Sequence, residues 1–148
     1  MTVRAAGLLV YRLSTNSSPQ SIEYLLLRTS YGQHHYTPPK GHVDPGEDEY
    51  TAAVRETREE AGLDVIQSEV AVDPSWQHTL SYVAHNQPKT VVYWLAQYSH
   101  GKVTLSHEHE HFEWAPLAHA CQLMCKYKDM CDMLTGAETY LLKKHNLV

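Results

Sequence analysis

The chain has 148 residues, of which 43% are hydrophobic and 20% are charged. This length and composition are typical of one globular domain with its own core, so we expect residues 1–148 to form a single domain. The formal net charge of −5 argues against a protein that binds long nucleic acids, which usually present a basic surface. The sequence holds no run of about 18 apolar residues, so we expect neither a membrane-spanning helix nor a membrane partner.

Three cysteines lie close together, at Cys121, Cys125 and Cys131. Their number is odd, and their spacing suits one or two turns of helix better than a disulfide framework. We therefore expect thiols without a catalytic role in a reducing compartment, the cytoplasm, with access to the nucleus left open. The apolar N-terminus fits a first strand better than a signal peptide, because no small-residue cleavage site follows it.

Hydrophobic periodicity and turn residues predict a chain made mostly of strands. Strands are expected over 3–13, 22–29, 68–73, 76–84 and 90–98, and a loop that runs into a strand over 106–114. The polar segment with Pro19 predicts a hairpin between the first two strands, and paired prolines with two glycines predict a loop over 31–41. Helices are expected over 47–62, from Pro116 onward and over 135–144. This order predicts a mixed α/β domain with helices packed on a sheet.

The helix expected over 47–62 has two different faces. One face is largely apolar and should pack against the sheet; it carries Tyr50, Ala53, Val54, Thr57 and Ala61. Another face carries three carboxylates, those of Glu56, Glu59 and Glu60. Like charges at this spacing destabilise a helix by about 0.2–0.5 kcal/mol per pair.

Clustered carboxylates make physical sense if divalent cations bind them, because oxygen ligands suit Mg²⁺ or Mn²⁺. Taken alone, the same segment is also compatible with a solvated charged face on which Arg55 and Arg58 neutralise the glutamates. The wider spacing decides between the two interpretations. Residues 41–63, GHVDPGEDEYTAAVRETREEAGL, fit the pattern G-x5-E-x7-R-E-U-x-E-E-x-G-U, where U is a bulky aliphatic residue.

The matching positions of this pattern are Gly41, Glu47, Arg55, Glu56, Glu59, Glu60, Gly62 and Leu63. At average residue usage, so many matches would arise by chance in fewer than roughly one in 10⁵ chains of this length. The segment therefore resembles the Nudix box, the motif of the Nudix hydrolases. Thr57 stands where a bulky aliphatic residue is usual, and we expect this departure to affect packing only.

The resemblance implies the Nudix fold, an α/β/α sandwich with a central mixed β-sheet and a loop-helix-loop box. It implies that Glu56, Glu59 and Glu60 hold Mg²⁺, which Mn²⁺ can replace, with the backbone carbonyl of Lys40 as a further ligand. It also implies that Arg55 pairs with Glu47 and that this pair, like Gly41 and Gly62, has a structural role. The chemistry implied is metal-assisted attack of water on a phosphoanhydride.

Three segments outside the box, over 34–48, 82–96 and 105–114, resemble the asymmetric diadenosine tetraphosphate (Ap4A) hydrolases of animals. The similarity runs in order over about residues 3–133, and only residues 14–20 and the last dozen look particular to this chain. It implies cleavage of Ap4A to ATP and AMP by a monomer whose partner is a small dinucleoside polyphosphate. It implies substrate contacts from Tyr31, His35, Lys40, Tyr82, Lys89 and Tyr127.

Each of these residue types suits its implied role. His35, Lys40 and Lys89 would contact phosphates, while Tyr82 and Tyr127 would stack on adenine, an interaction worth about 1–3 kcal/mol per base. Glu108, in the loop before the last strand, would be a further metal ligand or would help to activate water. The general base stays open among Glu56, Glu60 and Glu108.

Several alternatives remain open in the sequence. The box does not exclude a nucleotide sugar, ADP-ribose, an oxidised nucleoside triphosphate or a capped RNA as the substrate. A nucleotide sensor that has lost its chemistry has no support in the sequence, because all three box glutamates are present. Tyr82 could be a packing residue of a strand. A zinc site is a weak alternative, because it would need cysteine or histidine pairs at set spacing; the histidines concerned are His34, His35, His107, His109 and His111.

Overall fold

The computed structural model describes residues 2–14 and 20–147, so the expected turn with Pro19 lies outside the described residues. The elements in chain order are β1 (Val3–Ser14), β2 (Ser21–Thr29), β3 (Tyr36–Thr37), β4 (Lys40–His42), α1 (Glu49–Ala61), β5 (Val70–Ala84), β6 (Gln87–Tyr98), β7 (His109–Pro116), α2 (Leu117–Leu123) and α3 (Lys128–Lys144). None of the helices in these two described ranges is long and apolar enough to cross a membrane.

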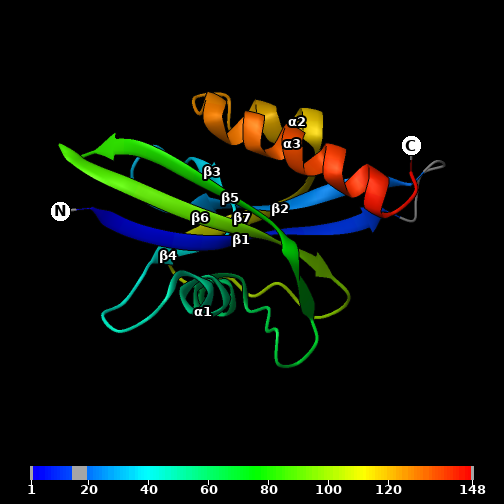
Figure 1. Ribbon diagram of the computed structural model, residues 1–148, viewed down its shortest axis with the longest axis horizontal. Helices are drawn as coiled ribbons and strands as arrows, with labels where there is room; N and C mark the ends of the chain where they lie inside the picture. The colour runs from blue at the N-terminus through cyan, green and yellow to red at the C-terminus, as the bar shows by residue number, and fades with distance from the viewer. Residues whose placement is uncertain (1, 15–19, 148) are drawn as a thin grey trace.

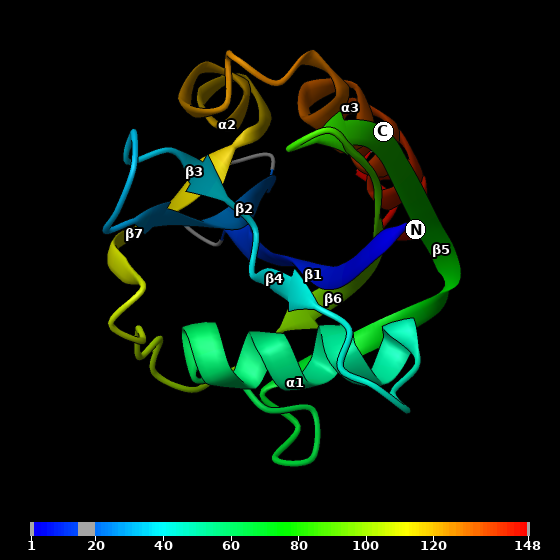
Figure 2. The ribbon, with the colours of Figure 1, turned by 90° about the vertical axis from the view of Figure 1, so that its left-hand side faces the viewer.

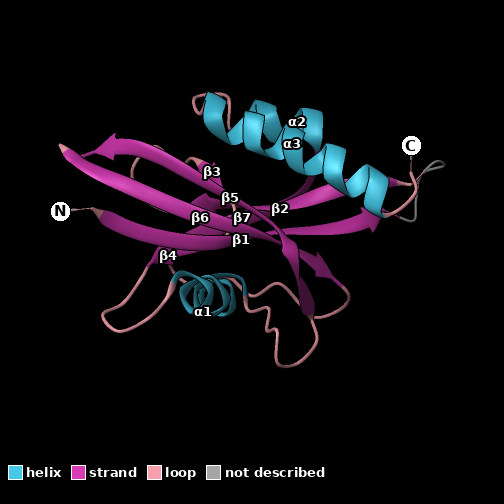
Figure 3. Ribbon diagram, in the orientation of Figure 1, coloured by secondary structure: helices cyan, strands magenta, loops and turns pink. Residues whose placement is uncertain are grey.

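The strands form one mixed sheet in the order β3-β2-β1-β6-β5, with β4 added beside β1 and β7 beside β2. β1 and β6 run parallel, and β1 pairs antiparallel with β2. Helix α1 covers one face of the sheet, and α2 and α3 cover the other (Figures 1 and 3). The expected α/β/α sandwich is confirmed.

Each face of the sheet has its own hydrophobic core, and β1 contributes to both. Leu9 and Tyr11 pack in the cluster beneath α2 and α3, whereas Leu8 and Val10 pack in the cluster beneath α1. Successive side chains of a strand point to opposite faces, so a strand covered on both sides is apolar at nearly every position. This explains why the N-terminal segment reads as a continuous apolar run.

Two expectations about strands need correction. The segment over 31–41 is not all loop, because it contains β3 and the start of β4. The two strands expected over 68–73 and 76–84 are one strand, β5, whose pairing with β6 shifts between Asp73 and Gln77. Pro74 lies at this irregularity and has no amide hydrogen to give to a ladder, which makes one bulged strand look like two in the sequence.

The buried face of α1 differs from the expected one. Its buried residues are Ala52, Ala53, Thr57, Glu60 and Ala61. Tyr50 is 43% exposed and rests edge-on against Trp94, with ring centroids 5.5 Å apart. Thr57 is fully buried, and its hydroxyl donates to the Ala53 carbonyl at 2.8 Å, so the polar atom is satisfied without disturbing the packing.

The last helix is longer than expected, since α3 begins at Lys128 and not at residue 135. A buried stripe of Met133, Leu134, Ala137 and Leu141 extends along most of its length. This stripe packs against the core beneath α2 and α3, and such tertiary packing stabilises a helix more than local propensity does.

The cysteines also require a correction, because Cys121 and Cys131 form a disulfide and only Cys125 is free among the described residues. Cys121 lies in α2 and Cys131 lies in the first turns of α3. The chain reverses between these helices and brings the two Cα atoms within 5.1 Å of each other. Spacing along the sequence could not show this approach, because it depends on how the two helices pack.

We predict that the Cys121–Cys131 disulfide stabilises the protein by roughly 2–3 kcal/mol, since it closes a short loop in the unfolded chain. Urea unfolding of Cys131→Ser should show this loss relative to the wild type under non-reducing conditions. Cys125→Ser is the matched control and should unfold like the wild type. Equal stability of wild type and Cys131→Ser without reductant would contradict the prediction.

A second stabilising contact joins α3 to β5 through Asp73, whose side chain is 7% exposed. Its carboxylate accepts hydrogen bonds from Lys144 Nζ at 2.8 Å and from the Tyr140 hydroxyl at 2.7 Å. Burial alone would raise the pKa of Asp73, but these hydrogen bonds outweigh it and lower the pKa to about 2. A carboxyl group whose pKa is lowered by folding stabilises the protein above its unfolded pKa and loses this contribution as the pH falls through the folded value.

We therefore predict that Asp73→Asn lowers the free energy of unfolding by roughly 2 kcal/mol at pH 7. The difference from the wild type should shrink as the pH falls from about 4 to about 2, and thermal melts over this range would measure it. Asp132→Asn, which removes an exposed pair with Lys128, is the control and should have little effect. A difference that stays constant down to pH 2 would show that the ionised form of Asp73 is not what stabilises the fold.

Candidate active site

Helix α1 has well-defined ends, which place its acidic side chains. The Asp48 side chain caps the N-terminus by accepting from Thr51 N at 2.8 Å. Gly62 ends the helix as expected, with a φ of 72° and its amide donating to the Arg58 carbonyl at 2.9 Å. A Cβ at Gly62 would lie 2.9 Å from Thr104 Cβ, so both the backbone conformation and the space require glycine.

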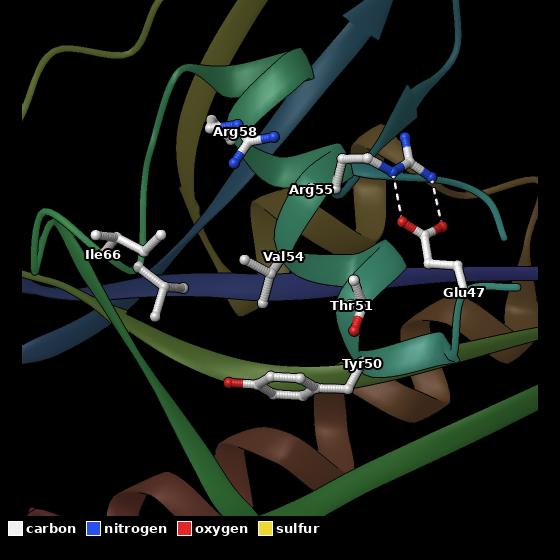
Figure 4. Close-up of a pocket in the computed structure, with 8 residues that line it drawn as sticks. Glu47, Tyr50, Thr51, Val54, Arg55, Arg58 and Ile66 are labelled. Atoms are coloured by element: carbon white, nitrogen blue, oxygen red, sulfur yellow. Dashed lines mark hydrogen bonds and ion pairs between the residues drawn. The ribbon is translucent and has the colours of Figure 1, made fainter. Parts of the chain in front are cut away.

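The expected pair of Arg55 and Glu47 is present and is bidentate. Arg55 Nε donates to Glu47 Oε2 at 2.7 Å, and Nη2 donates to Glu47 Oε1 at 2.9 Å (Figure 4). Arg55 also donates to the His42 carbonyl at 3.0 Å, so it joins the helix to the end of β4. The hydrogen bonds from Arg55 lower the pKa of Glu47 to about 2.

Arg55 also binds two carboxylates of its own helix, besides an ion pair with Asp44 at 3.4 Å. Its Nη1 donates to Glu56 at 2.9 Å and to Glu59 at 2.7 Å. Glu59 is largely exposed, so for this residue the structure matches the interpretation of a neutralised, solvated helix face. Arg58 does not take part, because it has no ion-pair partner within residues 2–14 and 20–147 and lies exposed.

Glu60 behaves differently, since only 7% of it is exposed. Its carboxylate accepts from the backbone amide of Lys40 at 3.1 Å. Burial, with the nearby charges of Glu56 and Glu108, raises the pKa of Glu60 to about 8, against the opposing effect of the Lys40 amide and charge. A buried carboxylate in this position is unfavourable unless positive charge reaches it.

Glu56 lies beside Glu60 and packs its carboxylate against Gly41. A Cβ on Gly41 would collide with the Glu56 carboxyl group, which explains the glycine at the start of the box. Burial raises the pKa of Glu56 above its usual value, and the charges of Glu59 and Glu108 act in the same direction despite the contact with Arg55. The loop at Gly41 and helix α1 therefore hold two carboxylates in a partly dehydrated place.

Glu108 approaches from the loop before β7. Its carbonyl accepts from Ser30 N at 2.9 Å, which ties this loop to the end of β2. The same loop contacts α1 directly, because Ser106 N donates to the Glu60 carbonyl at 3.4 Å. Glu108 is exposed, yet its charge acts on both Glu56 and Glu60, so the three carboxylates lie near one another.

These donors fit a divalent cation of the Mg²⁺ or Mn²⁺ type, because carboxylate and carbonyl oxygens are the ligands that such ions prefer. The shared negative field of Glu56, Glu60 and Glu108 supports the same fit. In the described ranges, however, no three His, Cys, Asp or Glu side chains converge into a ready-made metal site. Arg55 occupies oxygens of Glu56 and Glu59, so a cation would have to displace part of this contact.

Positive charge gathers beside the carboxylates. Lys40 lies near Lys89 and His42, since its charge lowers the pKa of both, after the larger effect of burial. Neither Lys40 nor Lys89 has a carboxylate partner among the described residues. His35 belongs to the same group, and burial and then the charges of Lys40 and Lys126 lower its pKa. The unpaired lysines, in a protein of net charge −5, indicate a local site for an anion, and the neutral form of His35, which its lowered pKa favours, can donate a hydrogen bond to it.

Aromatic side chains border these cations. Tyr82 is 43% exposed and Tyr127 is 42% exposed, which the packing interpretation of Tyr82 does not explain. Lys89 faces Tyr82 across the β5–β6 pair, with its Nζ 6.0 Å from the ring centroid. The Tyr127 ring lies edge-on to His35, with centroids 5.8 Å apart, and Tyr31 is exposed next to Glu108.

Figure 2 looks onto the end of the sandwich where these residues lie. The β5–β6 hairpin, the short strands β3 and β4 and the connection between α2 and α3 surround it. Two residues near these lysines, His42 and Lys126, could not be assigned to the site from the sequence. His42 lies inside the box at a position that the motif leaves variable, and Lys126 lies in a connection whose place depends on helix packing.

The histidines considered for zinc are dispersed among other contacts. His34 Nδ1 lies 2.6 Å from Glu110, and His111 Nε2 lies 3.7 Å from Glu113. His109 is buried, and its Nδ1 is without a hydrogen-bond partner in the described structure.

The outer face of α1 carries a separate shallow groove of about 380 Å³. Its lining includes the Arg55–Glu47 pair together with Tyr50, Val54, Arg58 and Ile66, as Figure 4 shows. The box carboxylates Glu56, Glu59 and Glu60 are not among its described lining residues, so the groove is distinct from the site at the end of the sandwich.

Comparison with known proteins identifies the family of this chain. The model of the NUDIX domain matches residues 1–134. The bis(5'-nucleosyl)-tetraphosphatase (asymmetrical) of Mus musculus is 43% identical over 145 residues, which cover 95% of this chain and 97% of that protein. The protein of the same name from Caenorhabditis elegans is 44% identical over 142 residues, covering 95% of this chain and 98% of that protein.

A solved structure agrees with the sequence relatives. The crystal structure of a C. elegans Ap4A hydrolase binary complex superposes with a TM-score of 0.87 at 43% identity, covering 95% of this chain and 98% of that one. The family match spans most of the chain. The relatives align with nearly all of the chain, and their sequence identity is too high for the similarity to be one of fold alone. This protein therefore belongs to the Nudix family of hydrolases.

Proposed function

We propose that this Nudix hydrolase cleaves Ap4A asymmetrically into ATP and AMP. The observation that carries the proposal is the order of groups at the end of the sandwich: acidic residues on α1, then unpaired cations, then two exposed tyrosines. The order fits a dinucleoside polyphosphate: the acidic residues would face the reacting phosphate, the cations the rest of the phosphate chain, and the tyrosines a base. The names of the mouse and C. elegans relatives describe the same activity.

The divalent ion in this proposal is Mg²⁺, with Mn²⁺ as a substitute. Glu56, Glu59, Glu60, Glu108 and the Lys40 carbonyl would hold it. A bound cation of this kind neutralises phosphate oxygens and lowers the pKa of water. The protein contributes the positions of these oxygens, which Gly41 and the Arg55–Glu47 pair define by fixing the loop before α1 against the helix.

The cations of the chain bind and orient the phosphates. Lys40, Lys89 and His35 lie on segments that converge near Glu60, and lysine ammonium groups are compact charges suited to phosphate oxygens. Because these groups are partly buried, their interaction with an anion is screened less by water than on an open surface. They hold the phosphate chain against the acidic end of α1, which places one phosphorus atom for attack by water.

Tyr82 and Tyr127 hold one adenine by stacking, and the exposed Tyr31 offers a further contact near Glu108. Lys40 contacts Glu60 through its amide, and Lys89, on which the charge of Lys40 acts, lies next to Tyr82, so the proposal puts the stacked base at the far end of the phosphate chain from the reacting phosphate. The proton of the attacking water goes to a carboxylate of Glu56, Glu60 or Glu108, each of which faces the site.

The proposed reaction makes a direct prediction about its products. With Ap4A, Mg²⁺ and ¹⁸O-labelled water, ATP and AMP should form in equal amounts with the label in AMP, because water attacks the phosphate next to one adenosine. Mass spectrometry of the products would measure this. Formation of two ADP molecules, or faster cleavage of ADP-ribose, an oxidised nucleoside triphosphate or a capped RNA at equal concentration, would overturn the assignment.

We predict that Glu60→Gln lowers kcat by roughly 10²–10⁴-fold, the size expected when metal binding or acid–base help is lost. Its thermal stability should not fall, since burial already favours the uncharged form of Glu60 and the amide oxygen of Gln can still accept from the Lys40 amide. Glu49→Gln on the same helix is the matched control, because Glu49 pairs with Arg4 on the protein surface, and it should keep full activity. Near wild-type activity in Glu60→Gln would show that the metal is held elsewhere.

A further inference from the structure

One cation at the end of the sandwich has no role in the proposed function so far. Lys126 lies in the connection between α2 and α3, and its Nζ donates to the amide oxygen of Gln33 at 2.8 Å. Within the described parts of the chain it has no carboxylate partner. Lys128, two residues further on, differs in this respect because it pairs with Asp132 at 2.9 Å.

The connection that carries Lys126 has a defined conformation. Met124 is 1% exposed and anchors it in the core, and Tyr127 N donates to the Met124 carbonyl at 2.8 Å. The Cys121–Cys131 disulfide closes the segment from both sides. The backbone that carries Lys126 therefore has a defined place, and the hydrogen bond to Gln33 directs the exposed side chain toward the loop before β3.

Two contacts join this connection to the loop before β3. Lys126 binds Gln33, and Tyr127 packs against His35 with ring centroids 5.8 Å apart. Lys126 and Tyr127 are neighbours in the chain, and both side chains reach the same loop, where the charge of Lys126 acts on the His35 ring that Tyr127 contacts. In a nucleotide, the group next to the base and its ribose is the first phosphate.

We propose that Lys126 is a specificity-determining residue that contacts the phosphate next to the stacked adenosine, at the end of the chain opposite to the reacting phosphate. The inference rests on the proposed function, because it assigns Lys126 to the half of Ap4A that leaves as ATP. Lys126 extends the group formed by Lys40, Lys89 and His35 outward to the tyrosines. It favours substrates whose phosphate chain is long enough to reach both the carboxylates of α1 and the tyrosines.

Product inhibition tests this assignment, because ATP and AMP report on the two halves of the substrate separately. Lys126→Met should raise KM for Ap4A and the inhibition constant of ATP by about tenfold each, the effect of losing one charge-assisted contact, while kcat and the inhibition constant of AMP change by less than about twofold. Lys126→Arg should retain most of the affinity. Lys128→Met is the matched control and should behave like the wild type, and thermal melts should show all three variants folded.

The outcomes separate the two proposals. A wild-type enzyme that does not convert Ap4A to ATP and AMP contradicts the proposed function. If the wild type makes these products but Lys126→Met leaves the inhibition constant of ATP unchanged, or weakens ATP and AMP equally, the role of Lys126 is wrong and the proposed function stands. The same loss in Lys128→Met would show a general effect of surface charge and would also overturn the role of Lys126.

Discussion

The site depends on how the protein offsets the repulsion between carboxylates that lie close together on α1 in one partly buried place. Glu60 is almost fully buried without a cationic side chain bonded to it, and Glu56 lies against the backbone of Gly41. Such an arrangement is unstable for an isolated helix. It persists because Arg55 neutralises one side of the cluster and the Lys40 amide supports the other, and because the sheet buries the opposite face of the helix.

Arg55 has a double role in this arrangement. Its two hydrogen bonds to Glu47 and one to the His42 carbonyl fix the loop that precedes α1. Its third nitrogen, Nη1, donates to Glu56 and Glu59. The loop and the helix are thereby positioned relative to each other by one side chain. A guanidinium suits this task because its planar fork can bind several oxygens at once in a fixed geometry, which a lysine cannot do.

The other half of the site comes from elements that are distant in sequence. The β5–β6 hairpin supplies Tyr82 and Lys89, and the connection between α2 and α3 supplies Lys126 and Tyr127. The helices α2 and α3 are held by their own core on the face of the sheet opposite to α1. Groups that would bind phosphate and base therefore come from two layers, the sheet and the layer of α2 and α3. The β5–β6 hairpin and the connection between α2 and α3 lie at the same end of the sandwich.

The sequence by itself determined the family, the acidic helix and its ends, because these depend on residues close together in the chain. Gly41, Arg55 and Gly62 have fixed spacing in the box, and the alternation of apolar and polar residues is enough to indicate most strands. The tertiary structure alone decided which face of α1 is buried, the joining of two expected strands across Pro74, and the pairing of Cys121 with Cys131. It also placed Lys126 beside Gln33. Contacts of this second kind depend on how helices and strands pack against one another, and local pattern and propensity carry no information about packing.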